Sequence, residues 1–205
     1  RLIRRQRQMC IRDSIRRYEM KRIIPIVIAL TIVFSFAAEK SFPKFTLTDL
    51  SGGTIALDSI LAQQKPIVIT FWATWCKPCK KELRKLHEYW ESWDTTKGER
   101  PYIIAALCED GPRSVRQAKT MAKKEGWDKF ILPYDKGGTV RKKAGVADIP
   151  ECFILMPNGN IVYHHIGFNP GDEKKTIEIL EKSIEEIEQD AQDAVSYTHL
   201  TLPTN

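Results

Sequence analysis

The sequence predicts an α/β protein whose mixed β-sheet is covered by helices on both faces. Two uninterrupted apolar runs, residues 67–72 and 102–107, have the length and composition of strands buried on both sides. Amphipathic segments with helical spacing follow both runs, and this alternation is typical of parallel strands joined by crossover helices. An Asn-Gly pair at residues 158–159 separates two more strand-like runs, which predicts an antiparallel hairpin.

The first element expected along the chain is a β-hairpin with Gly52 and Gly53 in its turn. Its apolar positions are Phe45, Leu47, Leu50, Ile55 and Leu57. The buried strand at 67–72 follows, and then a helix from residue 76 to about residue 93. One side of this helix carries charged residues, and the other carries an apolar stripe for the core.

The remaining elements complete the sheet and its covering helices. In order, they are a buried strand at 102–107, a helix at 112–126, a short edge strand at 130–132, a short helix from 137 to about 145, a hairpin of strands 152–156 and 161–166, and a helix from 171 or 172 to about 189.

Only the middle of the chain is expected to fold as a domain, over residues 39–190. Residues 20–38 have a short positive start, an apolar run and small residues suited to cleavage, which together predict a signal peptide. An uncleaved N-terminal membrane anchor is the alternative interpretation. Residues 1–19 and 195–205 resemble translated adapter sequence, so we interpret both as scars, and a native basic arm is the alternative for the first.

The positive charge of the chain is confined to its N-terminal segment. Residues 1–38 hold nine Lys and Arg against two Asp and Glu, whereas residues 39–194 hold 23 against 24. The expected domain is therefore close to neutral. This balance does not favour a nucleic-acid partner, which would need a concentrated positive surface.

Five cysteines are present, and only Cys76 and Cys79 are close together. A Cys-x-x-Cys pair indicates a redox dithiol, half of a zinc site or a chance pairing. A structural zinc site usually has a second Cys or His pair, and Cys108 and Cys152 are isolated, so we expect no metal. We interpret these two cysteines as small buried residues, and the alternatives are exchange with the dithiol or a second disulfide.

The dithiol lies where a buried strand ends and a helix begins. The first helical turn has unpaired N–H groups and a partial positive charge, and both stabilise a thiolate. We therefore expect Cys76 to be the nucleophile and Cys79, deeper on the same side, to resolve the mixed disulfide. Pro78 fits the first turn because its missing N–H would be unpaired there, and Lys77 adds positive charge beside the nucleophile.

Two aromatic residues flank this motif. We expect Trp72 and Trp75 to supply apolar cover and a contact surface for a partner chain. An inert pair of thiols, or a purely stabilising disulfide, is the alternative to a reactive dithiol.

Residues 71–82, Phe-Trp-Ala-Thr-Trp-Cys-Lys-Pro-Cys-Lys-Lys-Glu, resemble the active-site segment of thioredoxin-like proteins, in particular the TlpA/ResA group of exported reductases. The resemblance extends from residue 42 to residue 187. It implies a thioredoxin fold with an added N-terminal β-hairpin. It also implies a cis peptide bond before Pro150, with the backbone of Ile149 pairing with the substrate strand.

Glu82 matches a position of that family, three residues after the second cysteine. A carboxylate there could raise a thiol pKa or relay its proton, and a solvent-facing helix glutamate is the equal alternative. Thr70 stands where many thioredoxins have a buried aspartate, so the proton must be handled by Glu82, water or the thiolates. Lys77-Pro78 in place of Gly-Pro leaves the reduction potential open.

The sequence and the resemblance together predict an exported, periplasmic disulfide reductase of bacterial type that acts as a monomer. Reduced Cys76 would attack a disulfide of a partner protein, for which apocytochrome c is one candidate, and an upstream thiol protein would supply the electrons. No cofactor is expected. The alternatives are a disulfide oxidase or isomerase of the same fold, a copper-binding module, and a thiol peroxidase.

Overall fold

Alternating helices and strands form the part of the chain that the computed structural model describes, residues 40–93 and 99–200, with side chains described as far as residue 192. The elements are β1 (Thr46–Asp49), β2 (Thr54–Ala56), α2 (Leu57–Leu61), β3 (Ile67–Trp72), α3 (Lys77–Ser92), β4 (Ile103–Cys108), α4 (Val115–Lys124), η2 (Trp127–Lys129), β5 (Pro133–Tyr134), α5 (Thr139–Ala144), β6 (Glu151–Leu155), β7 (Ile161–Ile166) and α6 (Asp172–Leu200).

The strands form one mixed sheet in the order β2-β1-β5-β4-β3-β6-β7. β3 and β4 are parallel, whereas β6 runs antiparallel to β3 and pairs with β7 in the predicted hairpin. β1 and β2 form the predicted N-terminal hairpin, and Gly52 and Gly53 at its turn have φ values of 107° and 91°, which glycine adopts without strain. The sheet therefore has both the parallel centre and the antiparallel additions that the sequence predicts.

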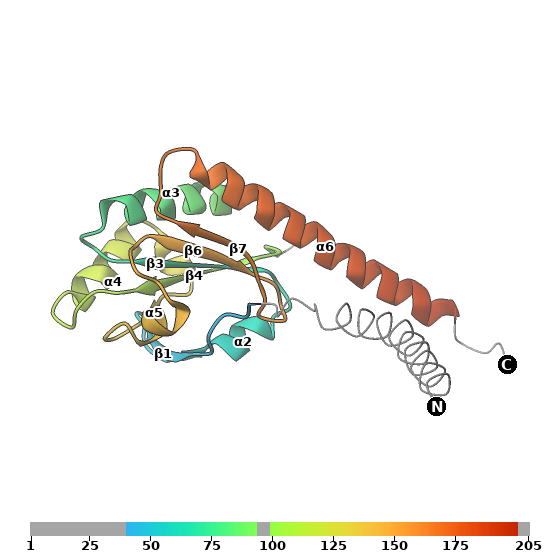
Figure 1. Cartoon of the computed structure of the whole chain (residues 1–205), viewed down its shortest axis with the longest axis horizontal. Helices are drawn as coiled ribbons and strands as arrows, with labels where there is room; N and C mark the ends of the chain where they lie inside the picture. Colours follow the sequence, from blue (N-terminus) through green and yellow to red (C-terminus); the bar gives the residue numbers. More distant parts are fainter. Residues whose placement is uncertain (1–39, 94–98, 201–205) are drawn as a thin grey trace, which may run out of the picture. The chain divides into compact units, whose positions relative to one another are not determined.

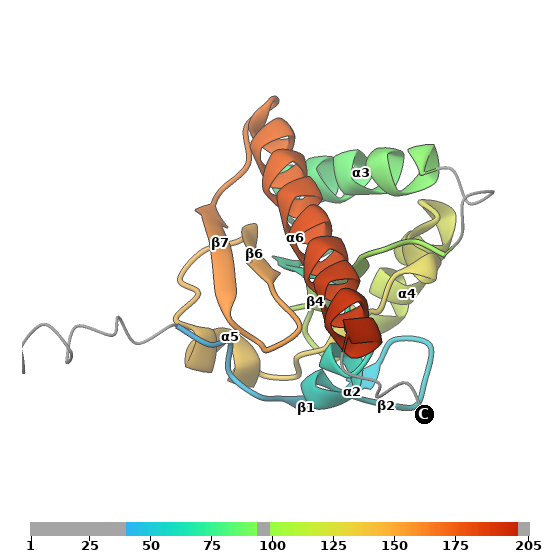
Figure 2. The same ribbon diagram turned by 90° about the vertical axis from the view of Figure 1, so that its right-hand side faces the viewer.

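Helices cover both faces of this sheet, as predicted. In Figure 1, α3 and α6 lie on one side of the strands and α2 and α5 on the other. Figure 2 shows α6 running across the sheet beside α3, with α4 further along the same side. Each face has its own apolar cluster, and the two are separated by the central strands.

β3 shows why an unbroken apolar run makes a central strand. All six of its residues are fully buried. Val68 and Trp72 pack into the cluster below α3, α4 and α6, while Ile69 and Phe71 pack into the cluster on the α2 and α5 side. This alternation follows the two-residue period of a strand, and here both faces find a core.

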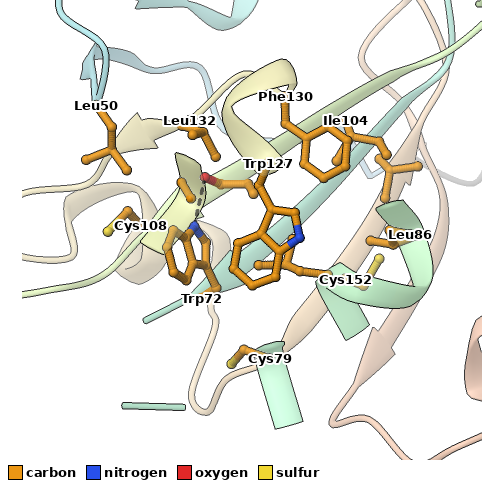
Figure 3. Packing of buried hydrophobic residues seen from close by; sticks show 14 of the residues in the cluster. Leu50, Trp72, Cys79, Leu86, Ile104, Cys108, Trp127, Phe130, Leu132 and Cys152 are labelled. Atoms are coloured by element: carbon orange, nitrogen blue, oxygen red, sulfur yellow. Dashed lines mark hydrogen bonds between the residues drawn. The ribbon is translucent and has the colours of Figure 1, made fainter. Parts of the chain in front are cut away.

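Trp72 is part of the core, so the expectation that it offers a surface to a partner is wrong. Its side chain is fully buried, and its ring lies edge to face against Trp127 with the centroids 5.5 Å apart. Its indole N–H donates to the carbonyl oxygen of Ala106 at 3.2 Å (Figure 3). The strand geometry places Trp72 on the inward face, whereas Trp75 lies beyond the strand end.

Several element boundaries differ from the sequence-based expectation. The strand expected at 130–132 is instead β5, and it lies inside the sheet because β1 pairs along its outer side. α4 begins at Val115 rather than near residue 112, and Leu57 opens helix α2 instead of continuing the hairpin. α6 continues beyond residue 189, as far as Leu200.

The predicted signal peptide and the predicted scar at residues 1–19 lie outside the described part of the chain, whereas residues 195–200 of the second predicted scar continue α6 and residues 201–205 lie outside. In residues 40–93 and 99–200, no helix is long and apolar enough to cross a membrane.

Candidate active site

A disulfide joins Cys76 and Cys79 at the point where β3 leads into α3. Cys76 is the N-cap residue of α3, and its sulfur accepts a hydrogen bond from the backbone N–H of Cys79 at 3.2 Å. Pro78 lies in the first turn of the helix, where a missing N–H leaves no carbonyl unpaired. The sequence motif therefore folds into the helix-start geometry in which a thiolate at Cys76 is stabilised.

The two cysteines are both buried, and their exposed neighbours lie on the Cys76 side. Cys79 is completely buried, and Cys76 retains 4% exposure. Around them, Lys77 and Pro78 are exposed, and Trp75 exposes 67% of its surface. Exposed residues therefore border Cys76 on both sides in the chain, and Cys79 lies deeper in the core.

The loop before β6 lies opposite the dithiol. The peptide bond between Ile149 and Pro150 is cis, as the resemblance implies. The carbonyl oxygen of Ile149 lies 3.7 Å from the sulfur of Cys76. The backbone N–H of Gly167 donates to the carbonyl of Pro150 at 2.8 Å, which ties the loop to the end of β7. The structure thus brings Ile149 and Pro150 together with Cys76, although 73 residues separate Ile149 from Cys76 along the chain.

Glu82 is buried with 4% exposure, so its interpretation as a solvent-facing helix residue is wrong. The hydroxyl of Thr70 donates to its carboxyl group at 2.5 Å. Burial raises the pKa of Glu82 to about 7; the hydrogen bond from Thr70 opposes this rise, and the charge of Asp172 adds to it. Thr70 on β3 and Glu82 on α3 therefore form a buried hydrogen bond, and the sequence did not predict this pairing.

Cys108 and Cys152 are both buried free thiols. Burial raises the pKa of Cys108 to about 12 and that of Cys152 well above its usual value. Cys152 pairs with Thr70 across β3 and β6, and the charge of Glu82 contributes to its raised pKa. Protonated, buried thiols react slowly, so these two fit the interpretation as small core residues.

A contact that the sequence did not reveal joins Asp110 to the active-site turn. Asp110 follows β4, and its carboxylate accepts hydrogen bonds from the backbone N–H of Thr74 at 2.9 Å and from its hydroxyl at 2.7 Å. One signal was available. β3 and β4 are predicted to be parallel, so polar residues that follow both strands meet at one edge of the sheet.

In the described residues, 40–93 and 99–192, no group of three or more His, Cys, Asp or Glu side chains is placed to hold a metal ion.

The fold and the site define a class: thioredoxin-fold domains with the Cys-x-x-Cys disulfide of thiol-disulfide oxidoreductases. The chain belongs to the AhpC/TSA family, whose model matches residues 38–164. Over 123 residues it is 32% identical to the thiol-disulfide oxidoreductase ResA of Bacillus thuringiensis, a match that covers 60% of this chain and 66% of that protein. Over 134 residues it is 32% identical to the thiol:disulfide interchange protein DsbE of Escherichia coli, covering 64% and 66%.

A solved structure agrees with these sequence relatives. The solution structure of a thioredoxin-like protein from Porphyromonas gingivalis matches with a TM-score of 0.59 at 30% identity, over 71% of this chain and 92% of that one. The thioredoxin fold and the resemblance to the TlpA/ResA group are therefore confirmed. The chain spans just under two thirds of the length of the first curated relatives.

Proposed function

We propose that this protein is a thiol-disulfide oxidoreductase that reduces disulfides of exported proteins. The observation that carries the proposal is the asymmetric dithiol at the start of α3. Cys76, which keeps 4% exposure, follows the exposed Trp75, and Cys79 is completely buried behind it. The names of two relatives, a thiol-disulfide oxidoreductase and a thiol:disulfide interchange protein, support the same chemistry.

The reaction is a two-step exchange. The thiolate of Cys76 attacks one sulfur of the client disulfide, forms a mixed disulfide and releases the other client sulfur, which takes up a proton. Cys79 then loses its proton and attacks the sulfur of Cys76. The second client sulfur leaves and is protonated, so the client gains two electrons and two protons, and the Cys76–Cys79 disulfide forms.

Glu82 is the group we assign to the proton of Cys79. It lies one helical turn further along α3, buried on the same side. A carboxyl group with a pKa of about 7 can accept a proton near neutral pH and release it again. Thr70 holds that carboxyl group in place through its hydroxyl.

The reductive direction is supported by the surroundings of the dithiol. Two buried carboxyl groups flank it along the chain, since Glu82 comes three residues after Cys79 on α3 and Asp110 binds Thr74, two residues before Cys76. Cys79 is also packed in an apolar cluster. Negative charge and burial both disfavour a thiolate, whereas a disulfide is neutral. The disulfide form is therefore favoured, and the reduced protein gives up its electrons readily.

The client is proposed to bind between Trp75 and the Ile149–Pro150 loop. The backbone of Ile149 would pair with an extended client segment, and Trp75 would cover the reacting sulfurs. Clients would be exported proteins with exposed disulfides, for which apocytochrome c is one candidate. An upstream thiol protein would reduce the dithiol again, and the periplasm is the proposed location.

A trapping experiment tests the proposal. Cys79→Ser cannot resolve the mixed disulfide, so it should retain its client bound to Cys76 in complexes that dithiothreitol releases and mass spectrometry identifies. A Cys76→Ser/Cys79→Ser variant is the control and should retain nothing. If Cys79→Ser also retains no exported protein, exchange with exported clients is wrong.

The direction is tested separately by the reduction potential. A reductase should have a potential near the thioredoxin value of about −270 mV, whereas an oxidase resembles DsbA at about −120 mV. Equilibration with glutathione mixtures gives this value. A potential close to the DsbA value would replace the reductase proposal with the oxidase of the same fold.

A further inference from the structure

Asp110 contacts the active-site turn from the end of the neighbouring strand. It is buried, with 2% exposure, and both of its carboxylate oxygens accept hydrogen bonds from Thr74, at 2.9 Å from the N–H and 2.7 Å from the hydroxyl. Thr74 is two residues before Cys76. The carboxylate is thus fixed directly against the segment that presents the nucleophile.

A third donor reaches the same carboxylate. The sulfur of Cys108 lies 3.5 Å from Oδ2 of Asp110. Because burial keeps Cys108 protonated, its S–H can donate to this oxygen. Three donors, an N–H, an O–H and an S–H, therefore surround one buried carboxyl group, and this arrangement suits its ionised form.

The turn itself is held from two directions. The ammonium group of Lys80 donates to the carbonyl oxygen of Thr74 at 2.9 Å, so every polar backbone atom of Thr74 has a partner. The N–H of Cys76 donates to the carbonyl of Ala73 at 3.0 Å. Asp110 and Lys80 thus both hold Thr74, just before Cys76, in place.

We infer that Asp110 is a positioning residue of the dithiol site and that its buried charge makes the reduction potential of the Cys76–Cys79 pair more negative. A fixed negative charge near Cys76 destabilises the thiolate of the reduced form and leaves the neutral disulfide unaffected. The equilibrium then shifts toward the disulfide. This inference rests on the proposed function, because it explains why this dithiol would act as an electron donor.

The test compares Asp110→Asn with the wild-type chain. The amide keeps the size and can still accept a hydrogen bond, but it has no charge. We expect the equilibrium with glutathione to shift about tenfold toward the dithiol, a potential about 30 mV less negative. We also expect the midpoint of iodoacetamide alkylation of Cys76 to move to lower pH. Asp135→Asn is the matched control.

Asp135 is a suitable control because it is also buried and also follows a strand, β5. Its carboxylate binds the start of α5 and not the active-site turn. Its oxygens accept from the backbone N–H groups of Thr139 and Arg141 at the start of α5, both at 2.8 Å. Its substitution should lower stability without moving the potential or the alkylation midpoint. A purely structural role of Asp110 would give that same pattern.

A second variant keeps the inference testable if Asp110→Asn does not fold. Cys108→Ala removes one donor and leaves the charge, so the negative field at Cys76 becomes stronger. We expect about a twofold shift in the opposite direction, toward the disulfide, with the alkylation midpoint at higher pH. The inference is wrong if the variant that folds leaves the potential and the alkylation midpoint unchanged. It is also wrong if Asp110→Asn and Cys108→Ala shift them in the same direction, or if Asp135→Asn shifts them as much as Asp110→Asn does.

The outcomes also separate the inference from the proposed function. A wild-type potential near that of DsbA would contradict the reductase proposal, whatever the variants do. A strongly negative wild-type potential with an unchanged Asp110→Asn variant would contradict only the role of Asp110.

Discussion

Glu82 is a carboxyl group that the fold removes from water even though most of the polar residues of its helix are exposed. Its pKa is raised to about 7 by burial, and the hydroxyl of Thr70 is the donor that opposes the rise. Where many thioredoxins have a buried aspartate on the strand, this chain has the donor on the strand and the carboxyl group on the helix. The buried carboxyl group at this place therefore comes from α3 rather than from β3.

The raised pKa of Glu82 predicts a pH dependence of stability. In the unfolded chain a glutamate ionises near pH 4.5, whereas folded Glu82 keeps its proton until about pH 7. The unfolded state therefore binds fewer protons in this window, and the free energy of unfolding falls as the pH rises through it. The contribution of Glu82 to that fall is about 3 kcal/mol. Urea unfolding of the oxidised protein between pH 4 and pH 8 measures it.

Glu82→Gln should remove most of this contribution, because the amide does not titrate. Glu109, whose pKa burial and nearby Asp135 raise to about 8, keeps a remaining slope in the variant. Glu186→Gln, an exposed change on α6, is the control and should leave the slope as in the wild type. Identical slopes for Glu82→Gln and the wild type would mean that Glu82 ionises normally in the folded protein.

At the scale of residues, the sequence predicted what a local pattern determines. Cys76, Cys79 and Pro78 are defined by four consecutive positions and by the strand-to-helix change around them. The contact of Asp110 with Thr74 spans 36 residues, and no spacing rule connects the two. Burial of Glu82 could not be decided from helical spacing, because it depends on tertiary packing, including the contact of its carboxyl group with Thr70 of β3.

The hairpin of β6 and β7 holds the loop opposite the dithiol. Glu151 is the first residue of β6, immediately after Pro150, and its side chain is 3% exposed. Nε2 of His164 on β7 lies 2.6 Å from its carboxyl group, and the His164 ring stacks on Phe153 with the centroids 4.3 Å apart. One histidine therefore partners the buried carboxyl group and covers an aromatic ring of the same hairpin.

Removing that partner should destabilise the protein. His164→Phe keeps a flat ring over Phe153 but leaves the buried carboxyl group of Glu151 without its donor, at a cost of about 1–3 kcal/mol. Urea unfolding at pH 7 measures the change. Val162→Ala, at an exposed position of the same strand, is the control and should change stability by less than about 1 kcal/mol.

A double-mutant cycle adds a stricter condition. If the pair interacts directly, Glu151→Gln should cost less in the His164→Phe background than in the wild type, because its partner is already lost. Additive effects of the two substitutions would show that the 2.6 Å contact contributes nothing to stability.

The elements themselves were mostly predictable, and the errors have physical causes. β3, α3 and the β6–β7 hairpin each have a strong period or turn signal. β5 has only two residues, too few for a strand pattern, and it can be recognised only from its pairing with β1 and β4. Helix α4 starts later than expected because residues 112–114 form a turn that leads into it.

At the scale of the whole molecule, the redox state of two residues is connected to the core. Cys76 and Cys79 belong to the apolar cluster that α3, α4 and α6 share, and Cys79 lies below Trp72 and Trp127 in Figure 3. The free energy of unfolding of the whole domain therefore depends on whether these two residues are thiols or a disulfide.

This connection predicts that the oxidised protein is more stable than the reduced protein. Closing the short Cys76–Cys79 loop removes conformational entropy from the unfolded chain, a contribution of about 2 kcal/mol to the oxidised form. The buried surroundings add to the difference, since Cys79 has no exposure and burial disfavours a thiolate. Urea unfolding with and without dithiothreitol measures the difference.

The sign of this difference bears on the direction of electron flow. Oxidation, reduction, folding and unfolding form a closed cycle, so a disulfide that stabilises the folded state has a more negative potential there than in the unfolded chain, by about 30 mV for each 1.4 kcal/mol. A Cys76→Ser/Cys79→Ser variant should be insensitive to dithiothreitol, which shows that the effect arises at this pair. A reduced form more stable than the oxidised form would mean that the fold favours the dithiol, and the protein would then accept electrons from its clients as an oxidase does.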